Sequence, residues 1–239
     1  MKTIIDLSLT LSEEYPTTWP GMTEFKHVLF QESPAKTYFF TMDEHAGTHC
    51  DAPSHFITKE NKQEQEKIEG HNLPLEAMQG PLAVIDVTNL KTTINALSPL
   101  IEPEVIKQWE KENNPLTPKD IVLFYTNWTR FYVKDEKIKQ FYLNKPVKEK
   151  SAQGWPTPSV ATLEYLHNKH IRCIGIDAPS IGAVHDGTKP HIYGLSNNMI
   201  FIENLANLHL LPPTTAHFIF LPLKIEHSTG CPGRAVAYV

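Results

Sequence analysis

The sequence predicts one α/β domain spanning 1–239, with a mixed β-sheet and a few packing helices. Short runs rich in β-branched and aromatic residues recur along the chain and are separated by turns at Pro and Gly. Helical spacing of apolar residues appears in only a few segments between them. The chain has 239 residues, 41% of them hydrophobic and 21% charged, which suffices for one sizeable core and requires no second domain.

The expected strands lie mainly at the two ends of the chain. Near the start they are "IIDLSLTL", "FKHVLF" and "KTYFFTM", with turns marked by Pro16, Pro20 and Gly21; "GPLAVIDVTNL" follows as a buried strand; near the end they are "NNMIFIENL", "AHFIFLPLKI" and "RAVAYV". The charged stretch 58–70 is expected to be a solvated loop or a short surface helix.

The middle of the chain predicts a strand–helix–strand unit. The run 120–128 is continuously apolar, as in a strand covered on both faces, and 171–177 is a second such strand. Between them 157–170 is expected to be helical, with Thr157 as the N-cap and Pro158 at the first helical position. A helix is expected over 102–113, before the first of these strands. After it, 130–156 is expected to form a helix followed by a long loop or flap.

Composition excludes several functional classes. A formal net charge of -5 and a pI of about 6.2 argue against nucleic-acid binding, which needs a basic face. No apolar run approaches the roughly 20 residues of a membrane helix, and the first residues lack the pattern of a secretory signal. Cys50, Cys173 and Cys231 form neither a CxxC pair nor a disulfide framework. We therefore expect a cytoplasmic protein that binds neither nucleic acid nor membrane.

The stretch "DEHAGTHCDAPSHF" (43–56) concentrates metal-ligand side chains. It contains His45, His49, Asp51 and His55, and imidazole with carboxylate is a donor set that zinc and manganese accept. In extended chain, His49 and Asp51 project to the same side. Gly47 permits a sharp bend that brings His45 back toward them. The spacing therefore predicts a metal site. The alternative is that these histidines cluster by chance and are ordinary surface or hydrogen-bonded core residues.

A catalytic metal site usually draws further ligands from distant parts of the chain. The available donors are His185, His191, Glu203, His217, Glu226 and His227, together with Asp177 at the end of a predicted strand. Their chemistry alone does not select among them.

The same stretch resembles the HxGTHxDxPxH signature of the metal-dependent cyclase family, which includes bacterial kynurenine formamidases, isatin hydrolases and related amide or lactone hydrolases. Other parts of the chain resemble the family as well: "TWPGM", "IGIDAPSI" (174–181), "FIENLANLHLLPP" (201–213) and "PLKIEHSTGCPGRAVA" (222–237). The resemblance therefore covers nearly the whole chain.

The resemblance implies specific roles for six residues. The first metal ligands correspond to His45, His49 and Asp51, and a second pair, twelve positions apart in the two-metal members, corresponds to His191 and Glu203. His55 corresponds to the catalytic histidine. The family binds one manganese or two zinc ions, so a divalent metal, Zn²⁺ or Mn²⁺, is expected as one or two ions.

The resemblance also implies a barrel-like core of the swivelling β/β/α type and a homo-oligomer, dimer or tetramer. The segment 127–156 is longer than in compact formamidases and is expected to shape the pocket. Four aromatic residues are candidates to line that pocket or to pack in the core: Trp19, Phe39, Trp128 and Trp155.

The function implied is a metal-dependent hydrolase that cleaves a small amide, an N-formyl aryl amine or a cyclic amide, with metal-activated water; in the formamidases this activity belongs to tryptophan catabolism. A lactone hydrolase or a ring-closing cyclase would use the same metal and histidine. A non-catalytic metal-binding or small-molecule-binding protein is the third possibility, and its metal site would be closed by four protein ligands.

Overall fold

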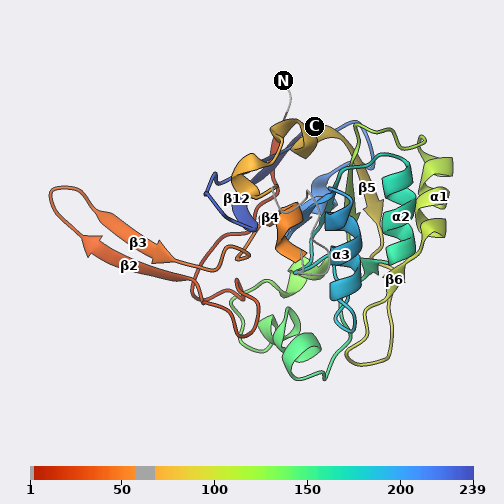
Figure 1. The fold of residues 1–239 in the computed structure, drawn as a ribbon. Helices are drawn as coiled ribbons and strands as arrows, with labels where there is room; N and C mark the ends of the chain where they lie inside the picture. The colour runs from red at the N-terminus through yellow and green to blue at the C-terminus, as the bar shows by residue number, and fades with distance from the viewer. Residues whose placement is uncertain (1–2, 57–67) are drawn as a thin grey trace.

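The strands of the core close into a mixed barrel (Figure 1). In the computed structural model, which describes residues 3–56 and 68–239, the barrel strands follow one another in the order β12–β11–β5–β7–β9–β10–β4, and β4 pairs back onto β12. β1 adds to the outer edge of β12, so that Ile4 pairs with Tyr238 and Thr3 lies beside Val239. The expected α/β fold with a barrel-like core is confirmed.

The strands have the following bounds: β1 Ile4–Asp6, β2 Lys26–Gln31, β3 Thr37–Thr41, β4 His49–Asp51, β5 Gln79–Asp86, β6 Leu100–Ile101, β7 Ile121–Tyr125, β8 Thr157–Pro158, β9 Cys173–Ile176, β10 Ile200–Glu203, β11 His217–Pro222 and β12 Gly230–Tyr238. The α-helices are α1 Pro103–Glu112, α2 Val160–Asn168 and α3 Thr188–Ser196. No helix in the described part of the chain is long and apolar enough to cross a membrane.

The strand–helix–strand unit predicted in the middle of the chain is present. β7 pairs in parallel with β9, and the chain between them contains α2. β5 and β10 extend this parallel group on either side, whereas β4, β11 and β12 pair antiparallel with their neighbours. The helix expected over 102–113 is α1. The stretch 58–70 lies almost entirely outside the described residues.

The parallel strands β7, β9 and β10 are buried on both faces. Along β7, Val122 and Phe124 belong to the hydrophobic cluster that includes residues of the helices, whereas Ile121 and Leu123 belong to a second cluster on the other side of the sheet. Because successive side chains of a strand alternate, such a strand must be apolar at every position. This explains the uninterrupted apolar run in the sequence.

The predicted N-terminus of the helix at 157–170 is wrong by two residues. Thr157 and Pro158 form β8, which pairs in parallel with β6, and Ser159 is the N-cap, its side chain accepting a hydrogen bond from the N–H of Thr162 at 3.2 Å. The Thr157 hydroxyl instead donates to the carbonyl of Ile181. Pairing with another strand therefore overrode the local capping preference.

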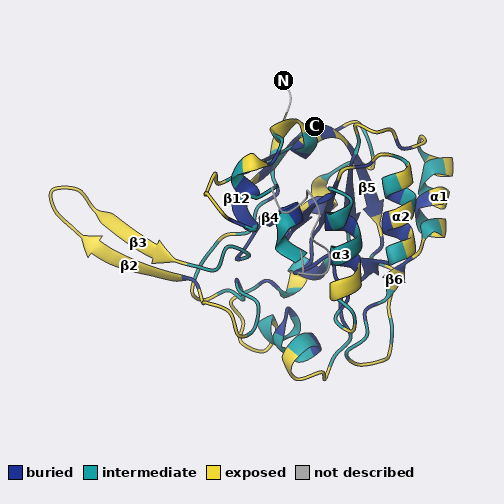
Figure 2. Ribbon diagram, viewed as in Figure 1, coloured by how far each residue is buried: buried dark blue, intermediate teal, exposed yellow. Residues whose placement is uncertain are grey.

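β2 and β3 form an antiparallel hairpin that stands away from the barrel (Figure 1) and is exposed along its whole length (Figure 2). The strand prediction for this region is confirmed. Its apolar side chains, however, do not enter the core.

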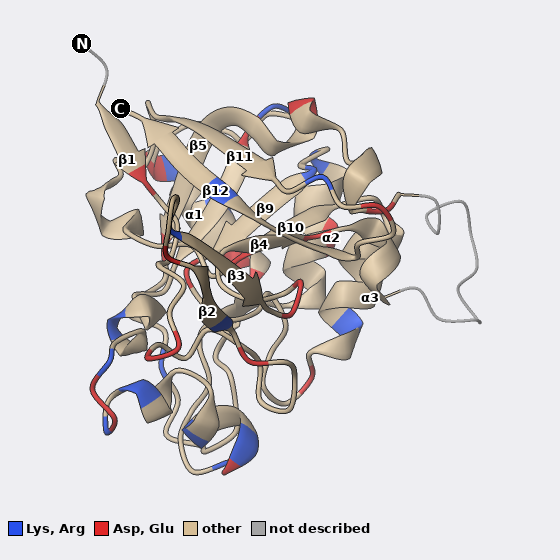
Figure 3. Ribbon diagram, turned by 90° about the vertical axis from the view of Figure 1, so that its left-hand side faces the viewer, with Lys and Arg blue, Asp and Glu red and all other residues tan. Residues whose placement is uncertain are grey.

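In place of the helix and flap expected over 130–156, the structure has short helical turns that begin at Trp128. These turns are Trp128–Phe131, Lys139–Phe141 and Asn144–Lys148. Buried Trp128 ties the segment together, because its indole N–H donates to the carbonyl of Tyr142 at 3.0 Å. Basic and acidic residues are interspersed on the turns at the bottom of the view in Figure 3. Trp128, Tyr132, Tyr142 and Leu143 are buried in the hydrophobic core, so the segment packs against the core.

One buried carboxyl makes stability depend on pH. Asp177 follows β9, is fully buried, and accepts hydrogen bonds of 2.6 Å from the N–H and the hydroxyl of Thr126. Burial raises the pKa of Asp177 from 3.8 to about 6 despite these bonds. Between these pH values the folded state binds more protons than the unfolded state. The contribution of Asp177 to the free energy of unfolding is therefore largest below pH 3.8, where its carboxyl is protonated in both states, and it is lost as pH rises through 6.

We therefore expect Asp177→Asn to remove a fall of about 3 kcal/mol in the free energy of unfolding as pH rises from about 2 to about 8, roughly 2 kcal/mol of it between pH 4 and 6, because one pKa unit corresponds to about 1.4 kcal/mol. Urea unfolding of both proteins with a chelator present, at several pH values, measures the difference. Identical pH profiles for the two proteins would contradict the prediction. Asp86→Asn, at an exposed position, is the matched control.

Candidate metal centre

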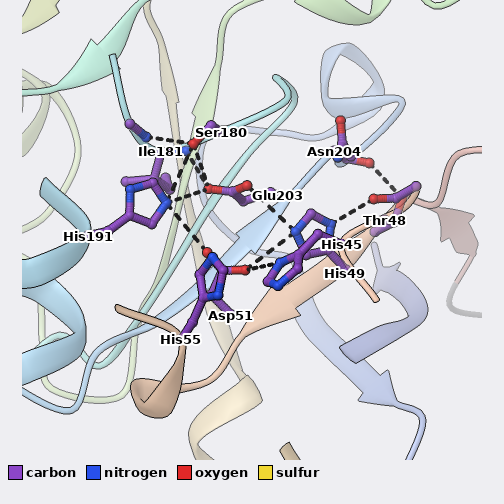
Figure 4. A network of polar contacts seen from close by, with 12 residues as sticks. His45, Thr48, His49, Asp51, His55, Ser180, Ile181, His191, Glu203 and Asn204 are labelled. Atoms are coloured by element: carbon purple, nitrogen blue, oxygen red, sulfur yellow. Dashed lines mark hydrogen bonds and ion pairs between the residues drawn. The ribbon is translucent and has the colours of Figure 1, made fainter. Parts of the chain in front are cut away.

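Five polar side chains converge at one end of the barrel, where β4 lies between β10 and β12 (Figure 4). β4 supplies His49 and Asp51, the end of β10 supplies Glu203, and α3 supplies His191. His45 comes from the turn before β4. In the antiparallel register Glu203 lies opposite His49, so the pairing of two strands places a residue from late in the chain beside the early motif.

The local geometry predicted for the early motif is confirmed. His49 and Asp51 lie on one side of β4, and Cys50 between them packs into the core with no exposed surface. Gly47 has φ +65°, a conformation that favours glycine, and a Cβ there would lie 2.4 Å from the Leu11 side chain. The resulting bend places His45 Nδ1 3.0 Å from Asp51 Oδ1.

Asp51 is shared by two groups of donors. His45, His49 and Asp51 form one group, and Asp51, His191 and Glu203 form the other; within each group the donor atoms lie within 4.8 Å of one another. His49 Nε2 is 3.4 Å from Asp51 Oδ1 and 3.6 Å from Glu203 Oε2. His191 Nε2 is 3.5 Å from Asp51 Oδ2 and 3.3 Å from Glu203 Oε1.

The donors are oriented as metal ligands are. His49 Nδ1 lies 2.9 Å from the carbonyl of Gly47, and His191 Nδ1 lies 2.6 Å from that of Gly187. A carbonyl only accepts, so each Nδ1 carries the hydrogen and each Nε2 faces the carboxylates. Among the described residues, buried His49 Nε2 and Asp51 Oδ2 have no hydrogen-bond partner. These side chains therefore fit a divalent cation, which would satisfy both atoms.

Electrostatics within the cluster balances two buried carboxylates against buried imidazoles. Burial disfavours a charged His49, but the close approach of Asp51 to its Nε2 and the charges of Asp51 and Glu203 outweigh burial and raise the pKa of His49 to about 9. The same competition raises the pKa of His191 to about 10. Burial would raise the pKa of Asp51, yet its contacts with His191, His45 and His49 hold it well below its usual value.

His55 lies beside this cluster rather than within it. It belongs to the short 3-10 helix Pro53–Phe56, and its ring centroid is 4.0 Å from that of His45. Burial, with the neighbouring imidazoles, lowers its pKa to about 4 although Asp51 opposes the shift. His55 is therefore neutral at pH 7 and can accept a proton.

A cavity of about 270 Å³ opens onto the cluster and His55. Its apolar wall is formed by side chains from outside the barrel strands: Pro16, Trp19, Met22, Phe56, Leu143 and Pro179. Leu143 is the contribution of the 127–156 segment. Of the four aromatic candidates, only Trp19 lines the cavity; Trp128 and Trp155 are core residues, and Phe39 is exposed on the hairpin.

The remaining donors proposed from the sequence lie elsewhere. His185, Glu226 and His227 are exposed, His217 begins β11, and the Asp177 carboxyl contacts Thr126. Two residues at the site had no assigned role in the sequence. Ser180 Oγ lies 3.2 Å from Glu203 Oε1, and Thr229 Oγ1 lies 3.5 Å from His55 Nδ1. Both lie in segments that resemble the family, "IGIDAPSI" and "PLKIEHSTGCPGRAVA", and this was the only signal.

Barrel, donor cluster and cavity together define a metal-dependent hydrolase that acts on small molecules. The cyclase family model ("Putative cyclase") matches residues 5–183, and the chain belongs to that family. It is 32% identical over 208 residues to an isatin hydrolase of Roseibium aggregatum, covering 84% of this chain and 74% of that protein. It is 27% identical to a kynurenine formamidase of Bacillus cereus, covering 97% and 95%.

Solved structures agree with this assignment. An isatin hydrolase bound to the product analogue thioisatinate superposes with a TM-score of 0.84 at 25% identity, covering 100% of this chain and 92% of that one. Isatin hydrolase A from Labrenzia aggregata, bound to benzyl benzoate, gives 0.84 at 27% identity, covering 100% and 94%.

Cation binding should release protons. With pKa values of about 9 and 10, His49 and His191 carry protons at pH 7 in the metal-free protein, and a cation at Nε2 must displace them. We expect about one proton released for each of these histidines that coordinates, and affinity that rises with pH. Calorimetric titration with Zn²⁺ or Mn²⁺, in buffers of different ionisation enthalpy, counts the protons.

His191→Gln should reduce the count by about one, whereas His217→Gln, away from the site, should leave it unchanged. Binding at pH 7 without proton release would show that these imidazoles are neutral before the cation arrives.

Proposed function

We propose that this protein is a divalent-metal-dependent amide hydrolase whose substrate is a small cyclic or N-formyl aryl amide. The observation that carries the proposal is the pairing of a buried His/Asp/Glu cluster with a neutral histidine at the end of a small, largely apolar cavity. The cluster is suited to bind a cation, His55 to move protons, and the cavity wall to hold a flat ring.

In this proposal His45, His49 and Asp51 hold one cation, and His191 and Glu203, with Asp51 shared, hold a second if two are bound. Zn²⁺ and Mn²⁺ both suit imidazole and carboxylate donors. A bound divalent cation would lower the pKa of water and polarise the substrate carbonyl. Ser180 and the N–H of Ile181, 3.2 and 2.6 Å from Glu203 Oε1, orient that carboxylate.

His55 is assigned the proton transfers. It takes a proton from the attacking water as the new C–O bond forms, and it donates that proton to the leaving nitrogen as the C–N bond breaks. A neutral imidazole in contact with the cavity can do the first step, and the imidazolium so formed can do the second. The products are a carboxylic acid and an aryl amine, joined in one molecule when the substrate is a ring.

A cyclic amide such as isatin is the favoured substrate. Support comes from the greater identity to isatin hydrolase and from the 0.84 TM-scores with two isatin hydrolases. An N-formyl aryl amine is the second candidate, because the kynurenine formamidase is matched over nearly its whole length. Trp19, Phe56 and Leu143 suit an aromatic ring in either case. A lactone would present the same carbonyl to the same groups and is included in the assay below.

The test separates cation binding from proton transfer. His49→Ala should lose the cation and all activity, because it removes a donor from the cluster. His55→Ala should keep the cation and lose about 10²–10⁴-fold in kcat, the usual contribution of positioned acid–base catalysis. Metal content by mass spectrometry, and turnover of isatin, N-formylkynurenine and an aryl lactone by metal-loaded, tag-free protein, are the measurements.

Chelation distinguishes the non-catalytic alternative. For a hydrolase, removing the metal abolishes turnover and re-addition restores it. A protein that unfolds on chelation and turns over none of these compounds would instead have a purely structural metal. His209→Ala, outside the cavity, is the control for both measurements.

We further propose that 1–239 acts as one cytoplasmic domain within a homo-oligomer, a dimer or tetramer. The three cysteines are free and buried, which suits a reducing compartment.

The β2–β3 hairpin supports the oligomer. Exposed large apolar residues occur on both of its strands: Val28, Leu29, Phe30, Tyr38, Phe39 and Phe40. A lone two-stranded hairpin is marginally stable in water, and such a patch usually marks an interface.

Replacing one apolar residue on each hairpin face, as in Phe39→Glu with Phe40→Glu, should shift the protein toward the monomer, because the charges would have to be buried. Light scattering after size-exclusion chromatography gives the mass. Glu32→Lys, between the strands, should leave the mass unchanged. A wild-type protein that is already monomeric at micromolar concentration would remove this part of the proposal.

A further inference from the structure

A chain of polar contacts runs from Glu44 through Thr229 to His55. Thr229 precedes β12 and is 185 positions from Glu44 in the sequence. Its hydroxyl donates to Glu44 Oε1 at 2.5 Å, and its backbone N–H lies 3.2 Å from both carboxylate oxygens. On its other side the same hydroxyl oxygen lies 3.5 Å from His55 Nδ1. Thr229 therefore bridges an acidic residue and the histidine beside the cavity.

The direction of each hydrogen bond in this chain follows from chemistry. An ionised carboxylate has no hydrogen to give, so the single hydroxyl hydrogen of Thr229 points to Glu44. The Thr229 oxygen is then left with lone pairs only, and His55 Nδ1 must be the donor. A neutral imidazole carries one hydrogen, so Nε2 is unprotonated. Among the described residues, none makes a hydrogen bond to His55 Nε2, so none of them occupies its lone pair.

We propose that Glu44 and Thr229 are positioning residues that hold His55 as the Nδ1–H tautomer, with the Nε2 lone pair available as the base. The inference deepens the proposed function and rests on it, because a defined tautomer matters for the reaction only if His55 moves a proton. Neither residue needs to touch the substrate or the cation.

The contacts of Glu44 favour this role over a role on the metal cluster. Its carboxylate makes three contacts with Thr229, whereas its distance to His45 Nε2 is 3.8 Å, beyond hydrogen-bond range. Thr229 also fixes the start of β12 against β4, since its carbonyl accepts the N–H of Ala52 at 2.8 Å. This backbone contact positions residue 229, and a substitution that removes only the side-chain hydroxyl leaves the contact intact.

The first experiment observes the tautomer directly. In metal-free protein with ¹⁵N-labelled histidine, the ring nitrogens of His55, assigned by comparison with His55→Gln, should show a protonated Nδ1 and an unprotonated Nε2. Thr229→Val, which removes only the hydroxyl, should yield a mixture of tautomers, and Thr229→Ser should restore the wild-type pattern. Glu44→Gln should also give a mixture, because an amide both donates and accepts.

The second experiment measures turnover of the metal-loaded protein. Thr229→Val should lose about 10- to 100-fold in kcat, the usual effect of removing an orienting partner, with KM and metal content close to wild type. Thr229→Ser should recover most of the lost kcat. Thr41→Val, an exposed position on the hairpin, is the matched control.

The outcomes separate the inference from the proposed function. An Nε2–H tautomer in wild type, or an unchanged His55 spectrum in Thr229→Val, overturns the inference whether or not the protein is active. A loss of metal in Thr229→Val would also overturn it, because the residue would then act on the cluster. Conversely, if no amide is hydrolysed but the Nδ1–H tautomer depends on Thr229, the positioning holds and the proposed function fails.

Discussion

The site depends on one buried carboxylate. Asp51 is 1% exposed and lies within 3.5 Å of three imidazoles, those of His45, His49 and His191. A carboxylate removed from water is costly unless it is paired, so the imidazoles and the carboxylate must be buried together. β4 provides the frame for this, because it is paired on one edge with β10 and on the other with β12. The strand pairings of β4 that close the barrel therefore also bring His49 and Asp51 beside Glu203.

Environment gives the histidines of one small region different chemistry. His49 and His191 face two carboxylates, which raise their pKa values to about 9 and 10. His55, a few residues further along the chain, contacts other imidazoles in a partly buried position, and its pKa falls to about 4. Titratable groups whose pKa values are separated in this way take different roles, as cation ligands on one side and proton carrier on the other.

The parts of the molecule that select a substrate are separate from the parts that hold the cluster. Four of the five cluster residues lie on barrel strands and one helix, with His45 on the turn before β4, whereas Trp19, Met22 and Leu143 come from connecting segments. Such segments tolerate sequence change better than paired strands do. This division explains how one family carries different amide substrates on a common barrel, and of the segment 127–156 only Leu143 lines the cavity.

The sequence by itself determined what is local. His45, His49 and Asp51 lie within seven positions, so strand alternation and the bend at Gly47 were sufficient to bring them together. The continuous apolar runs of β7 and β9 likewise predicted strands buried on both faces, because burial acts on each residue directly.

The chemistry of the side chains left open which distant residues join the motif: the family resemblance indicated His191 and Glu203, and only the tertiary structure supplied the physical reason. Histidines and acids are common in the second half of the chain, and their chemistry did not distinguish Glu203 from Glu226; the antiparallel register that sets Glu203 opposite His49 did. The same reason applies to Thr157, whose capping potential was overridden by pairing with β6, and to Thr229, which meets Glu44 across 185 positions. Contacts between strands far apart in sequence depend on the free energy of the whole barrel, which no local pattern encodes.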